Sequence, residues 1–243
     1  RDVVLLKQVG CHPVIIHGGG PQITEHLEKQ GIESNFANGM RITDEKSIDI
    51  IEMVLGGLIN KDIVNTITSL GGKAVGLSGK DGGLIRAKKI EGEGELKNID
   101  FKNTGTVKSI DPGVVKLLDG STFIPVIAPI GIGDDGKTYN INADIVAGKI
   151  AHILQASKYL ILTNTEGILD SNGSLIQSIN TDGVKKLVEK GILSQGMLPK
   201  VNSALEAVTS GVEHVQIIDG TIDHSVILEL FTDEGIGTMI RRN

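Results

Sequence analysis

The sequence contains few aromatic residues and a single cysteine. Only 2% of its 243 residues are aromatic and none is Trp, so a surface that stacks nucleic-acid bases is not expected. Cys11 has no second cysteine to pair with, and we interpret it as a small buried hydrophobic residue. The sequence also has no apolar run of membrane-spanning length and no signal-peptide pattern. These absences favour a cytoplasmic protein without a membrane or nucleic-acid partner.

Glycine and aliphatic residues dominate what is present. The chain has 32 glycines, 40% hydrophobic residues and a net charge of −6, which suits one large α/β domain or two small ones. Apolar runs alternate with helical segments, and this alternation predicts a mostly parallel sheet with helices on both faces and sites at the carboxyl ends of its strands. We expect helices over 22–30, 45–70, 112–118, 145–155, 181–190, 200–210 and 224–231. Strands are expected over 13–17, 73–79, 84–90, 107–110, 122–129, 158–163, 214–219 and 237–241, with the last at a sheet edge and residues 91–106 as an exposed polar excursion.

The start of the sequence is unusual. The chain begins with Arg1, and the stretch from Asp2 to Val9 has the pattern of the end of an amphipathic helix. We therefore expect that a further N-terminal segment precedes it.

A run of three glycines follows the first apolar strand. His17-Gly18-Gly19-Gly20-Pro21 closes the run from Pro13, and Pro suits the first turn of a helix. A strand, a glycine turn and a helix N-terminus together offer free N–H groups to an anion. The pattern predicts a phosphate or carboxylate site, although a tight turn without a ligand would look the same.

A loop arginine precedes the longest expected helix. Asn38-Gly39 is a turn signal, and Asp44 is suited to cap the helix that follows. Arg41 lies between them, where its guanidinium could bind a carboxylate in a fork. The alternative is a solvated surface arginine.

A second polar stretch alternates before the helix at 145. Asn140, Asn142 and Asp144 would face one side of an extended segment. Amide groups bind carboxylates or amides, and Asp binds a cation such as Mg²⁺ or an ammonium group. Helix capping by Asn142 or Asp144 is the alternative interpretation.

Two features in the last third also indicate a ligand. A polar cluster from Asn164 to Asp170 follows the expected buried strand that ends at Thr163. It is a candidate site for a nucleotide ribose or for a metal-bound water, or an ordinary turn at the end of a strand. Lys200 lies in the first turn of a helix, where a cation opposes the dipole and favours a nearby anion.

Six motifs follow one another in order over nearly the whole chain. They are His17-Gly-Gly-Gly-Pro-Gln22, Asn38-Gly-Met-Arg-Ile-Thr43, Val75-Gly-Leu-Ser-Gly-Lys-Asp-Gly82, Asn140-Ile-Asn-Ala-Asp144, Leu162-Thr-Asn-Thr-Glu-Gly-Ile-Leu169 and Gly196-Met-Leu-Pro-Lys-Val201. Together they resemble the motifs of the amino acid kinase family, and within it those of the N-acetylglutamate kinases.

The resemblance implies an open αβα sandwich with a mainly parallel central sheet. It implies an amino-acid-binding lobe over 1–138 and a nucleotide-binding lobe over 139–243. The reaction would transfer phosphate from ATP, with Mg²⁺, to the side-chain carboxylate of N-acetyl-L-glutamate in arginine biosynthesis. A carboxylate nucleophile needs no general base, which fits a chain that offers glycine amides and lysines. His17 is then structural, and no histidine spacing indicates a metal site.

Site roles follow by matched position. Gly18 and Gly19 would stabilise the transferring phosphoryl, and Arg41 would bind the substrate α-carboxylate. Asn140 and Asn142 would bind other polar groups of the substrate, and Asp144 would orient catalytic lysines. Lys200 would stabilise the phosphoryl from the nucleotide side. The nucleotide would contact Thr163, Asn164, Gly167, Ile168, Leu169, Gly196, Met197 and Lys200.

Three departures from the family pattern stand out. No Lys-x-Gly-Gly strand precedes Val14, which leaves out one catalytic lysine. Asn164 replaces a usual Asp, and Gln195 replaces a frequent Gly. We expect an incomplete copy of an active enzyme rather than an inactive protein.

The C-terminal stretch from His224 to Met239 resembles the tail of arginine-inhibited members. His224, Glu234 and Gly235 are therefore candidate effector residues for L-arginine; an ordinary helix, turn and edge strand is the alternative. We expect a homodimer through the helix at 45–70. The subgroup also forms hexamers as trimers of dimers, can bind a PII-type signalling protein, and lies in the plastid stroma in eukaryotes.

The sequence is also compatible with three other functions, to different degrees. The first is another family kinase, acting on an aminoadipate-type substrate, aspartate, carbamate or uridylate. The second is a non-catalytic arginine-binding module, which the absent lysine favours. A dinucleotide dehydrogenase is disfavoured because the glycine spacing differs from its fingerprint.

Overall fold

The computed structural model describes residues 1–37, 39–92, 97–193 and 196–243. The chain forms two compact units, one of residues 3–146 with Arg1 and one of residues 147–243 with Asp2. The division falls inside helix α6 (Ala143–Ile153). The assignment of residues 1–138 and 139–243 to two substrate-binding lobes stays a prediction.

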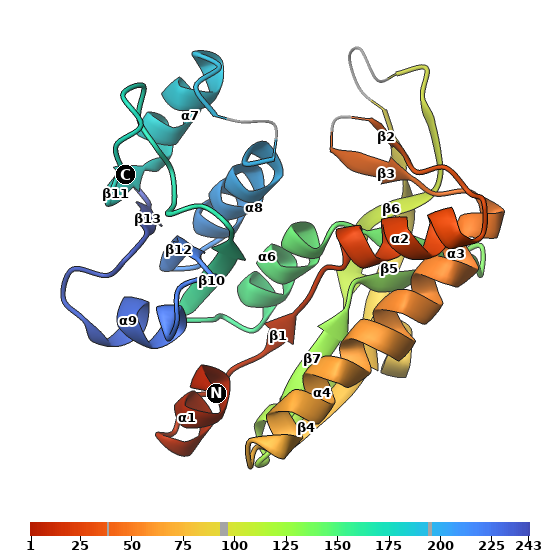
Figure 1. The fold of residues 1–243 in the computed structure, drawn as a ribbon, viewed down its shortest axis with the longest axis horizontal. Helices are drawn as coiled ribbons and strands as arrows, with labels where there is room; N and C mark the ends of the chain where they lie inside the picture. The colour runs from red at the N-terminus through yellow and green to blue at the C-terminus, as the bar shows by residue number, and fades with distance from the viewer. Residues whose placement is uncertain (38, 93–96, 194–195) are drawn as a thin grey trace. The chain divides into compact units, whose positions relative to one another are not determined.

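A three-stranded parallel sheet forms the centre of the first unit (Figure 1). Its order is β1 (Ile15–Ile16), β7 (Ile124–Ala128) and β4 (Ala74–Ser78). Every residue of β7 is buried, because a central parallel strand is covered on both faces. The continuous apolar runs predicted here are therefore confirmed as parallel strands.

Helices pack around this sheet. The first unit contains α1 (Asp2–Gln8), α2 (Gly20–Lys29), α3 (Glu45–Glu52), α4 (Asn60–Ser69) and α5 (Gly113–Asp119), and a short 3₁₀ turn, η2 (Asp81–Gly83). The predicted helix at 45–70 is present, but a π-helical segment, η1 (Met53–Ile59), joins α3 to α4. Asp44 caps α3 as predicted, since its carboxylate accepts the N–H of Ser47 at 2.9 Å.

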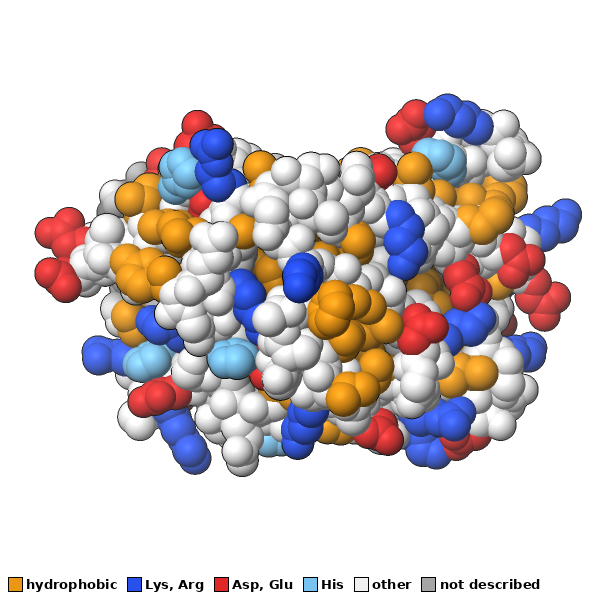
Figure 2. Space-filling model, turned by 90° about the horizontal axis from the view of Figure 1, so that it is seen from below, with side chains coloured by type: hydrophobic (Ala, Val, Ile, Leu, Met, Phe, Trp, Pro, Cys, Tyr) orange, Lys and Arg blue, Asp and Glu red, His pale blue; other side chains and the backbone are white. Residues whose placement is uncertain are grey.

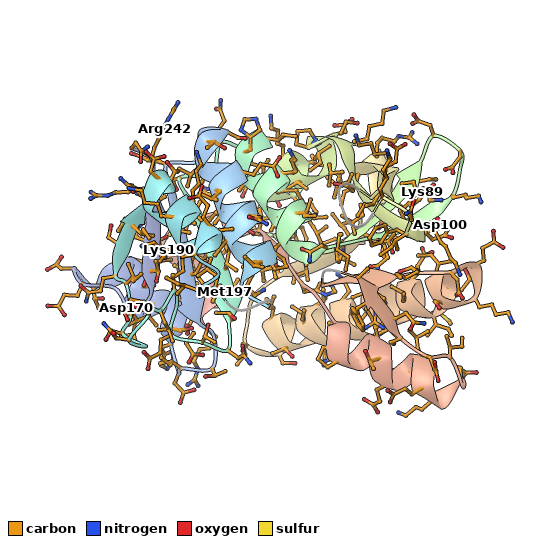
Figure 3. All side chains as sticks on the ribbon, turned by 90° about the horizontal axis from the view of Figure 1, so that it is seen from above. Lys89, Asp100, Asp170, Lys190, Met197 and Arg242 are labelled. Carbon is orange, nitrogen blue, oxygen red and sulfur yellow. The ribbon has the colours of Figure 1, made fainter. Side chains whose placement is uncertain are left out.

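A small closed barrel completes the first unit. It consists of β5 (Ile85–Glu91), β6 (Asp100–Ile110), β8 (Ile130–Gly133) and β9 (Thr138–Ile141). The prediction that 91–106 is an exposed excursion is wrong for its second half, because β6 is one long strand with Phe101 fully buried. Lys89 and Asp100 form an ion pair at 2.6 Å across the two long strands (Figure 3).

The hairpin of β2 (Asn35–Ala37) and β3 (Met40–Ile42) lies against β6. Its antiparallel register pairs Phe36 with Arg41. Asn38, part of the predicted turn, lies outside the described residues.

A mixed four-stranded sheet forms the second unit. Its order is β10 (Lys158–Thr163), β12 (His214–Asp219), β13 (Thr238–Arg241) and β11 (Ser178–Asn180). The terminal strand was expected at an edge, but β13 lies inside the sheet, antiparallel to β12 and parallel to β11. Helices α7 (Thr181–Glu189), α8 (Leu198–Thr209) and α9 (Ser225–Phe231) accompany this sheet, and α8 packs on β12 and β13.

The exposed surface carries charged side chains of both signs. On the face drawn in Figure 2, basic and acidic side chains are interspersed rather than gathered by sign. The interpretation of Cys11 as buried is wrong, because its side chain is exposed in the loop after α1. Within the described ranges, no helix is both long and apolar enough to cross a membrane.

Candidate functional site

The glycine loop directly follows the carboxyl end of β1. His17 continues the strand pairing, since its N–H donates to the Ile127 carbonyl at 3.3 Å, and α2 then begins at Gly20. Gly18 is exposed, whereas Gly19 faces η1 so closely that a Cβ there would lie 2.3 Å from the Ile59 side chain. Gly19 is therefore required by a close approach between the loop and the π-helical segment.

His17 is buried and bonded at both ring nitrogens. Its Nδ1 lies 3.0 Å from the Gly18 carbonyl, and its Nε2 lies 3.2 Å from the side-chain amide of Asn60. Burial lowers the pKa of His17, and the hydrogen bond with Gly18 opposes this only in part. The imidazole is therefore held in its neutral form, as a structural group should be.

Asn60 was not identified from the sequence. It is fully buried at the start of α4, and its amide nitrogen also contacts the carbonyls of Val126 and Leu77 at 3.0 and 3.3 Å. Its position together with Ile63, Val64 and Ile67 on the apolar stripe of α4 is the available signal, because a polar residue on a buried stripe needs a partner. Gly76 adjoins it, and a Cβ at Gly76 would lie 1.9 Å from Asn60 Oδ1.

Arg41 is buried rather than solvated. Its guanidinium donates to the Gly20 carbonyl at 3.1 Å, to Thr24 Oγ1 at 2.8 Å and to the Ser34 hydroxyl, and it lies 4.5 Å above the ring centre of Phe36. Burial lowers its pKa. Within the described chain, the partners that hold Arg41 are neutral oxygens and an aromatic ring.

Threonine hydroxyls attach the Arg41 hairpin to the barrel. Thr104 Oγ1 donates to the Arg41 carbonyl and accepts the N–H of Thr43 at 3.1 Å. Asn140, at the end of β9, donates to Thr43 Oγ1 at 3.2 Å. Thr43 and Thr104 are buried. The network therefore fixes Arg41 and Asn140 relative to each other, a connection that spacing alone did not predict.

The start of α6 reaches the glycine loop. Asn142 Oδ1 accepts the N–H groups of Asp144 and Ile145 at 2.8 and 3.3 Å, so Asn142 is used as a helix cap, as its alternative interpretation held. Asp144 lies in the first turn of α6. A Cβ at Gly18 would lie 3.8 Å from the Ala143 side chain, so the first unit brings the loop and this helix end together.

The second unit offers a strand-end loop. Thr163 ends β10, and its carbonyl accepts the Gly220 N–H at 2.8 Å, so the loops after β10 and β12 lie side by side. Asn164 is exposed, and its Oδ1 lies 3.5 Å from Thr163 Oγ1. Carboxyl ends of neighbouring parallel strands are where α/β proteins bind ligands.

Core contacts hold this loop in place. Ile168 is fully buried, and its N–H donates to Thr238 Oγ1 at 2.8 Å. Met197 belongs to the same apolar cluster, whereas Leu169 and Gly196 are exposed. The side chains of Ile168 and Met197 thus serve the core, and the Ile168 carbonyl accepts the N–H of Ile176 at 2.9 Å. Lys200 lies partly buried in the first turn of α8, and Gln195 lies outside the described residues.

The predicted effector residues lie around α9. His224 precedes α9 with a left-handed φ of 61°, and Glu234 and Gly235 follow it. Glu229, which the sequence analysis did not single out, is buried and accepts the N–H groups of Ile236 and Gly237 at 2.7 and 3.1 Å. A buried carboxylate therefore shapes the loop that carries Glu234 and Gly235.

The model of the amino acid kinase family matches residues 1–219 of this chain. The chain belongs to the amino acid kinase family. The acetylglutamate kinase of Alkalilimnicola ehrlichii is 53% identical over 248 residues, which cover 100% of this chain and 82% of that protein. These matches account for the six motifs found in order along the sequence.

Solved structures of similar proteins extend the comparison. The smu.665 protein of Streptococcus mutans has a TM-score of 0.85 at 26% identity, over 99% of this chain and 90% of that one. An N-acetylglutamate synthase of Neisseria gonorrhoeae, complexed with coenzyme A and N-acetyl-glutamate, has a TM-score of 0.82 at 29% identity, over 100% of this chain and 55% of that one. The N-acetylglutamate synthase from Neisseria gonorrhoeae complexed with coenzyme A and L-arginine has a TM-score of 0.80 at 27% identity, over 99% of this chain and 56% of that one. The α/β fold with parallel strands predicted from the sequence is the amino acid kinase fold.

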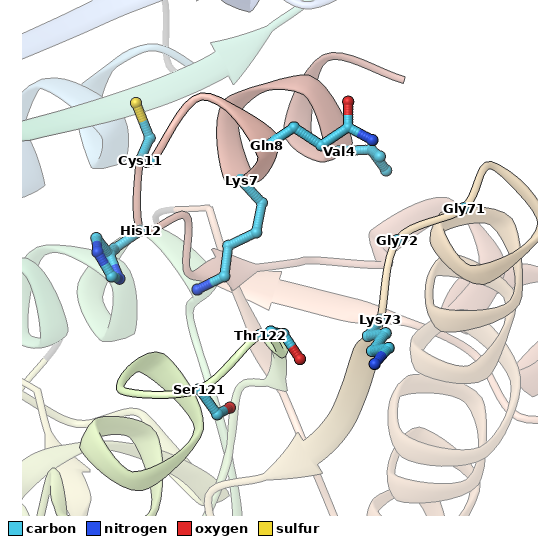
Figure 4. A pocket seen from close by; sticks show the side chains of 11 residues that line it. Val4, Lys7, Gln8, Cys11, His12, Gly71, Gly72, Lys73, Ser121 and Thr122 are labelled. Carbon is cyan, nitrogen blue, oxygen red and sulfur yellow. The ribbon is translucent and has the colours of Figure 1, made fainter.

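A separate pocket of the first unit lies away from the glycine loop (Figure 4). It has a volume of about 430 Å³ and lies at the amino ends of β4 and β7, lined by Lys7, Cys11, His12 and Lys73 among others. The glycine loop follows the carboxyl end of β1 in the same sheet. The pocket and the glycine loop therefore lie at opposite ends of the parallel strands of this sheet.

Proposed function

We propose that this chain transfers the γ-phosphoryl group of ATP to the side-chain carboxylate of N-acetyl-L-glutamate, in arginine biosynthesis. The observation that carries the proposal is the 53% identity, over the whole chain, with an acetylglutamate kinase. A carboxylate oxygen forms the new bond to phosphorus as the bond to the bridging β,γ oxygen breaks, which gives N-acetyl-L-glutamyl 5-phosphate and ADP. No general base is needed, so alignment and charge stabilisation supply the catalysis.

The first unit binds the amino-acid substrate in this proposal. Arg41 forms charge-assisted hydrogen bonds with the α-carboxylate, and its neutral surroundings support this role. Asn140 binds a further polar group, whereas the capping bonds of Asn142 leave it mainly a structural part. The N–H groups of Gly18 and Gly19 stabilise the charge that develops on the transferring phosphoryl.

The second unit binds ATP in this proposal. Loop residues after β10 and at the start of α8 contact the nucleotide, Lys200 stabilises the phosphoryl group, and Asp144 orients catalytic lysines. Mg²⁺ neutralises phosphate charge when it accompanies ATP. Among the described residues, no three His, Cys, Asp or Glu side chains gather closely enough to hold a metal.

Trapping of the acyl phosphate with hydroxylamine tests the proposal. The full-length protein is incubated with ATP, Mg²⁺ and one acceptor at a time: N-acetylglutamate, glutamate, an aminoadipate-type acceptor, aspartate, carbamate or uridylate. We expect hydroxamate with N-acetylglutamate at a kcat/KM at least 100-fold above that of the other carboxylate acceptors, and ADP release with carbamate and uridylate at background level. A higher value with another acceptor would move the protein to a different branch of the family.

Inhibition by L-arginine is a finer proposal. The likeness to a synthase that was solved with L-arginine supports it, as do the acidic Glu234 and the loop ordered by Glu229. A carboxylate would bind the guanidinium in a fork. Glu234→Gln is then expected to raise the arginine concentration for half-inhibition about tenfold without changing kcat, and equal curves for the two proteins would refute this effector site.

Assembly through the long helix is also a proposal. Met53 and Leu58 on η1 are 62% and 41% exposed, which supports an apolar contact with a second copy. Sedimentation of a Met53→Glu variant as a monomer, beside a dimer or hexamer of the unmodified protein, would support it. A PII-type signalling partner and a cytoplasmic location stay predictions from the sequence.

A further inference from the structure

Asn60 joins three strands and the glycine loop from one buried position. Its amide nitrogen contacts His17 after β1, the Val126 carbonyl in β7 and the Leu77 carbonyl in β4. These are all three strands of the parallel sheet in the first unit. Burial of an amide is costly unless hydrogen bonds compensate it, and a buried amide whose partners lie on several segments fixes those segments relative to one another.

The surrounding groups determine how the Asn60 amide is oriented. Its Oδ1 lies 3.2 Å from the ammonium group of Lys61, whereas its nitrogen faces two backbone carbonyls and a ring nitrogen. The opposite orientation would place the amide oxygen against two carbonyl oxygens and the NH₂ group against the ammonium. Asn60 therefore donates to His17 Nε2.

That donation determines the tautomer of His17. A nitrogen that accepts a hydrogen bond carries no proton, so the ring proton of the neutral imidazole is on Nδ1. Nδ1 lies 3.0 Å from the Gly18 carbonyl, which can only accept. The chain of hydrogen bonds thus runs from Asn60 through His17 to the carbonyl of the peptide between Gly18 and Gly19.

The orientation of this peptide decides where the Gly19 N–H points. In a planar trans peptide the carbonyl of Gly18 and the N–H of Gly19 point in opposite directions. Glycine leaves the peptide free to rotate, and a rotated peptide would turn a carbonyl oxygen toward the phosphoryl group. No described residue accepts a hydrogen bond from the Gly19 N–H, so this donor is available to a ligand.

We propose that Asn60 and His17 act as a positioning pair that holds the Gly18–Gly19 peptide with its Gly19 N–H turned toward the transferring phosphoryl. The inference rests on the proposed function and adds two residues to it. Neither side chain takes part in the chemistry: Asn60 selects the tautomer of His17, and the Nδ1 proton of His17 holds the peptide carbonyl.

Two substitutions of His17 separate this role from simple packing. An Asn side chain places its amide near the position of Nδ1, so His17→Asn can retain the bond to the Gly18 carbonyl. A Gln side chain places its amide near the position of Nε2, so His17→Gln retains the partner of Asn60 instead. We expect His17→Gln to lower kcat roughly 10- to 100-fold at unchanged KM for both substrates. The kcat of His17→Asn should stay much closer to that of the unmodified protein.

Asn60→Ala and the milder Asn60→Ser are expected to lower kcat similarly, again without a change in KM. Ile67→Ala is the matched control, because Ile67 lies on the same helix, packs in the apolar core and has no contact with the loop. It should lower the unfolding temperature while leaving kcat unchanged. Equal kcat values for His17→Asn and His17→Gln, or a kcat loss in Ile67→Ala that matches the Asn60 variants, would overturn the proposal.

The ¹⁵N chemical shifts of the His17 ring test the same pair without activity. In the unmodified protein we expect a protonated Nδ1 and an unprotonated Nε2, and in Asn60→Ala a mixture of tautomers. A proton on Nε2 in the unmodified protein would overturn the pair. If the expected tautomer is found but the hydroxylamine assay shows no product with any acceptor, the proposed function fails while the structural pair stands.

Discussion

The two units hold their candidate ligand groups by different means. In the first unit, side-chain hydrogen bonds fix the site: Arg41 is held by Thr24 and by the glycine loop, and its strand by Thr104. In the second unit, the apolar core fixes the loop after β10 through Ile168, with one hydroxyl of Thr238 at its backbone. In the proposed function, the carboxylate substrate would therefore bind to a polar network, and the nucleotide would bind to loops that the apolar core holds in place.

The largest effect is expected at Lys200, the charged residue in the first turn of α8. Lys200→Met removes the cation proposed to stabilise the phosphoryl group and should lower kcat about 10³-fold. Steady-state kinetics with hydroxylamine trapping measures it. Lys190→Met is the control, because Lys190 is exposed at the end of α7 in the same unit. A kcat within threefold of the unmodified value for Lys200→Met would remove Lys200 from the mechanism.

Arg41 should show a smaller effect that appears in KM. Arg41→Ala removes charge-assisted hydrogen bonds worth roughly 2 kcal/mol, so KM for N-acetylglutamate should rise about 30-fold while KM for ATP stays constant. Arg41→Lys keeps the charge but not the fork and should recover only part of the loss. If both variants changed kcat alone, Arg41 would act on the reacting group instead of the α-carboxylate.

A matched pair of threonine substitutions compares the two units directly. Thr104→Val and Thr238→Val each remove one buried hydroxyl, at roughly 1–2 kcal/mol of stability. Thr104→Val should raise KM for N-acetylglutamate several-fold, and Thr238→Val should raise KM for ATP by a similar factor. Kinetics with each substrate varied in turn measures both values, and the same KM shift in both variants would show that the units are not separately specialised.

The smallest effect concerns pH. Burial lowers the pKa of His17 in the folded chain, so below its ordinary value of about 6.5 the unfolded chain takes up the proton more readily. The His17 contribution to stability is therefore complete above pH 6.5 and declines as the pH falls. Melting temperatures between pH 5 and 8 should fall less steeply for His17→Asn than for the unmodified protein, and parallel curves would contradict the shifted pKa.

The elements that depend on apolar packing were predicted from the sequence better than those that depend on side-chain hydrogen bonds. The strands at Ala74–Ser78 and Lys158–Thr163 follow from continuous apolar runs, as does the parallel pairing of each with its neighbour. Their burial was overestimated, because Ala74–Ser78 is only partly buried throughout and Lys158–Thr163 has exposed positions. The polar half of β6 was missed because buried Asn103 and Thr104 are compatible with burial only through partners far away in sequence. Arg41 was found as a residue, but nothing in its spacing indicated that it is buried.

The same reasoning explains the error at β13 and the omission of Asn60. A short strand near the chain end has the pattern of an edge strand, and its inner position depends on pairing with β11, which is only three residues long. Asn60 lies on an apolar stripe, and a single polar residue among aliphatic neighbours gives no sequence signal that distinguishes a buried hydrogen-bonding role from chance. Both are long-range facts, and local periodicity carries no information about them.

The π-helical segment at Met53–Ile59 has a consequence for insertions and deletions. The two ends of the long helix pack against different elements: α3 packs against α2, and α4 packs against β4 and β7. Each residue added to or removed from an α-helix turns one end relative to the other by about 100°. The wider π turns set the phase between the ends, and with one residue fewer in this segment Asn60 would no longer face His17.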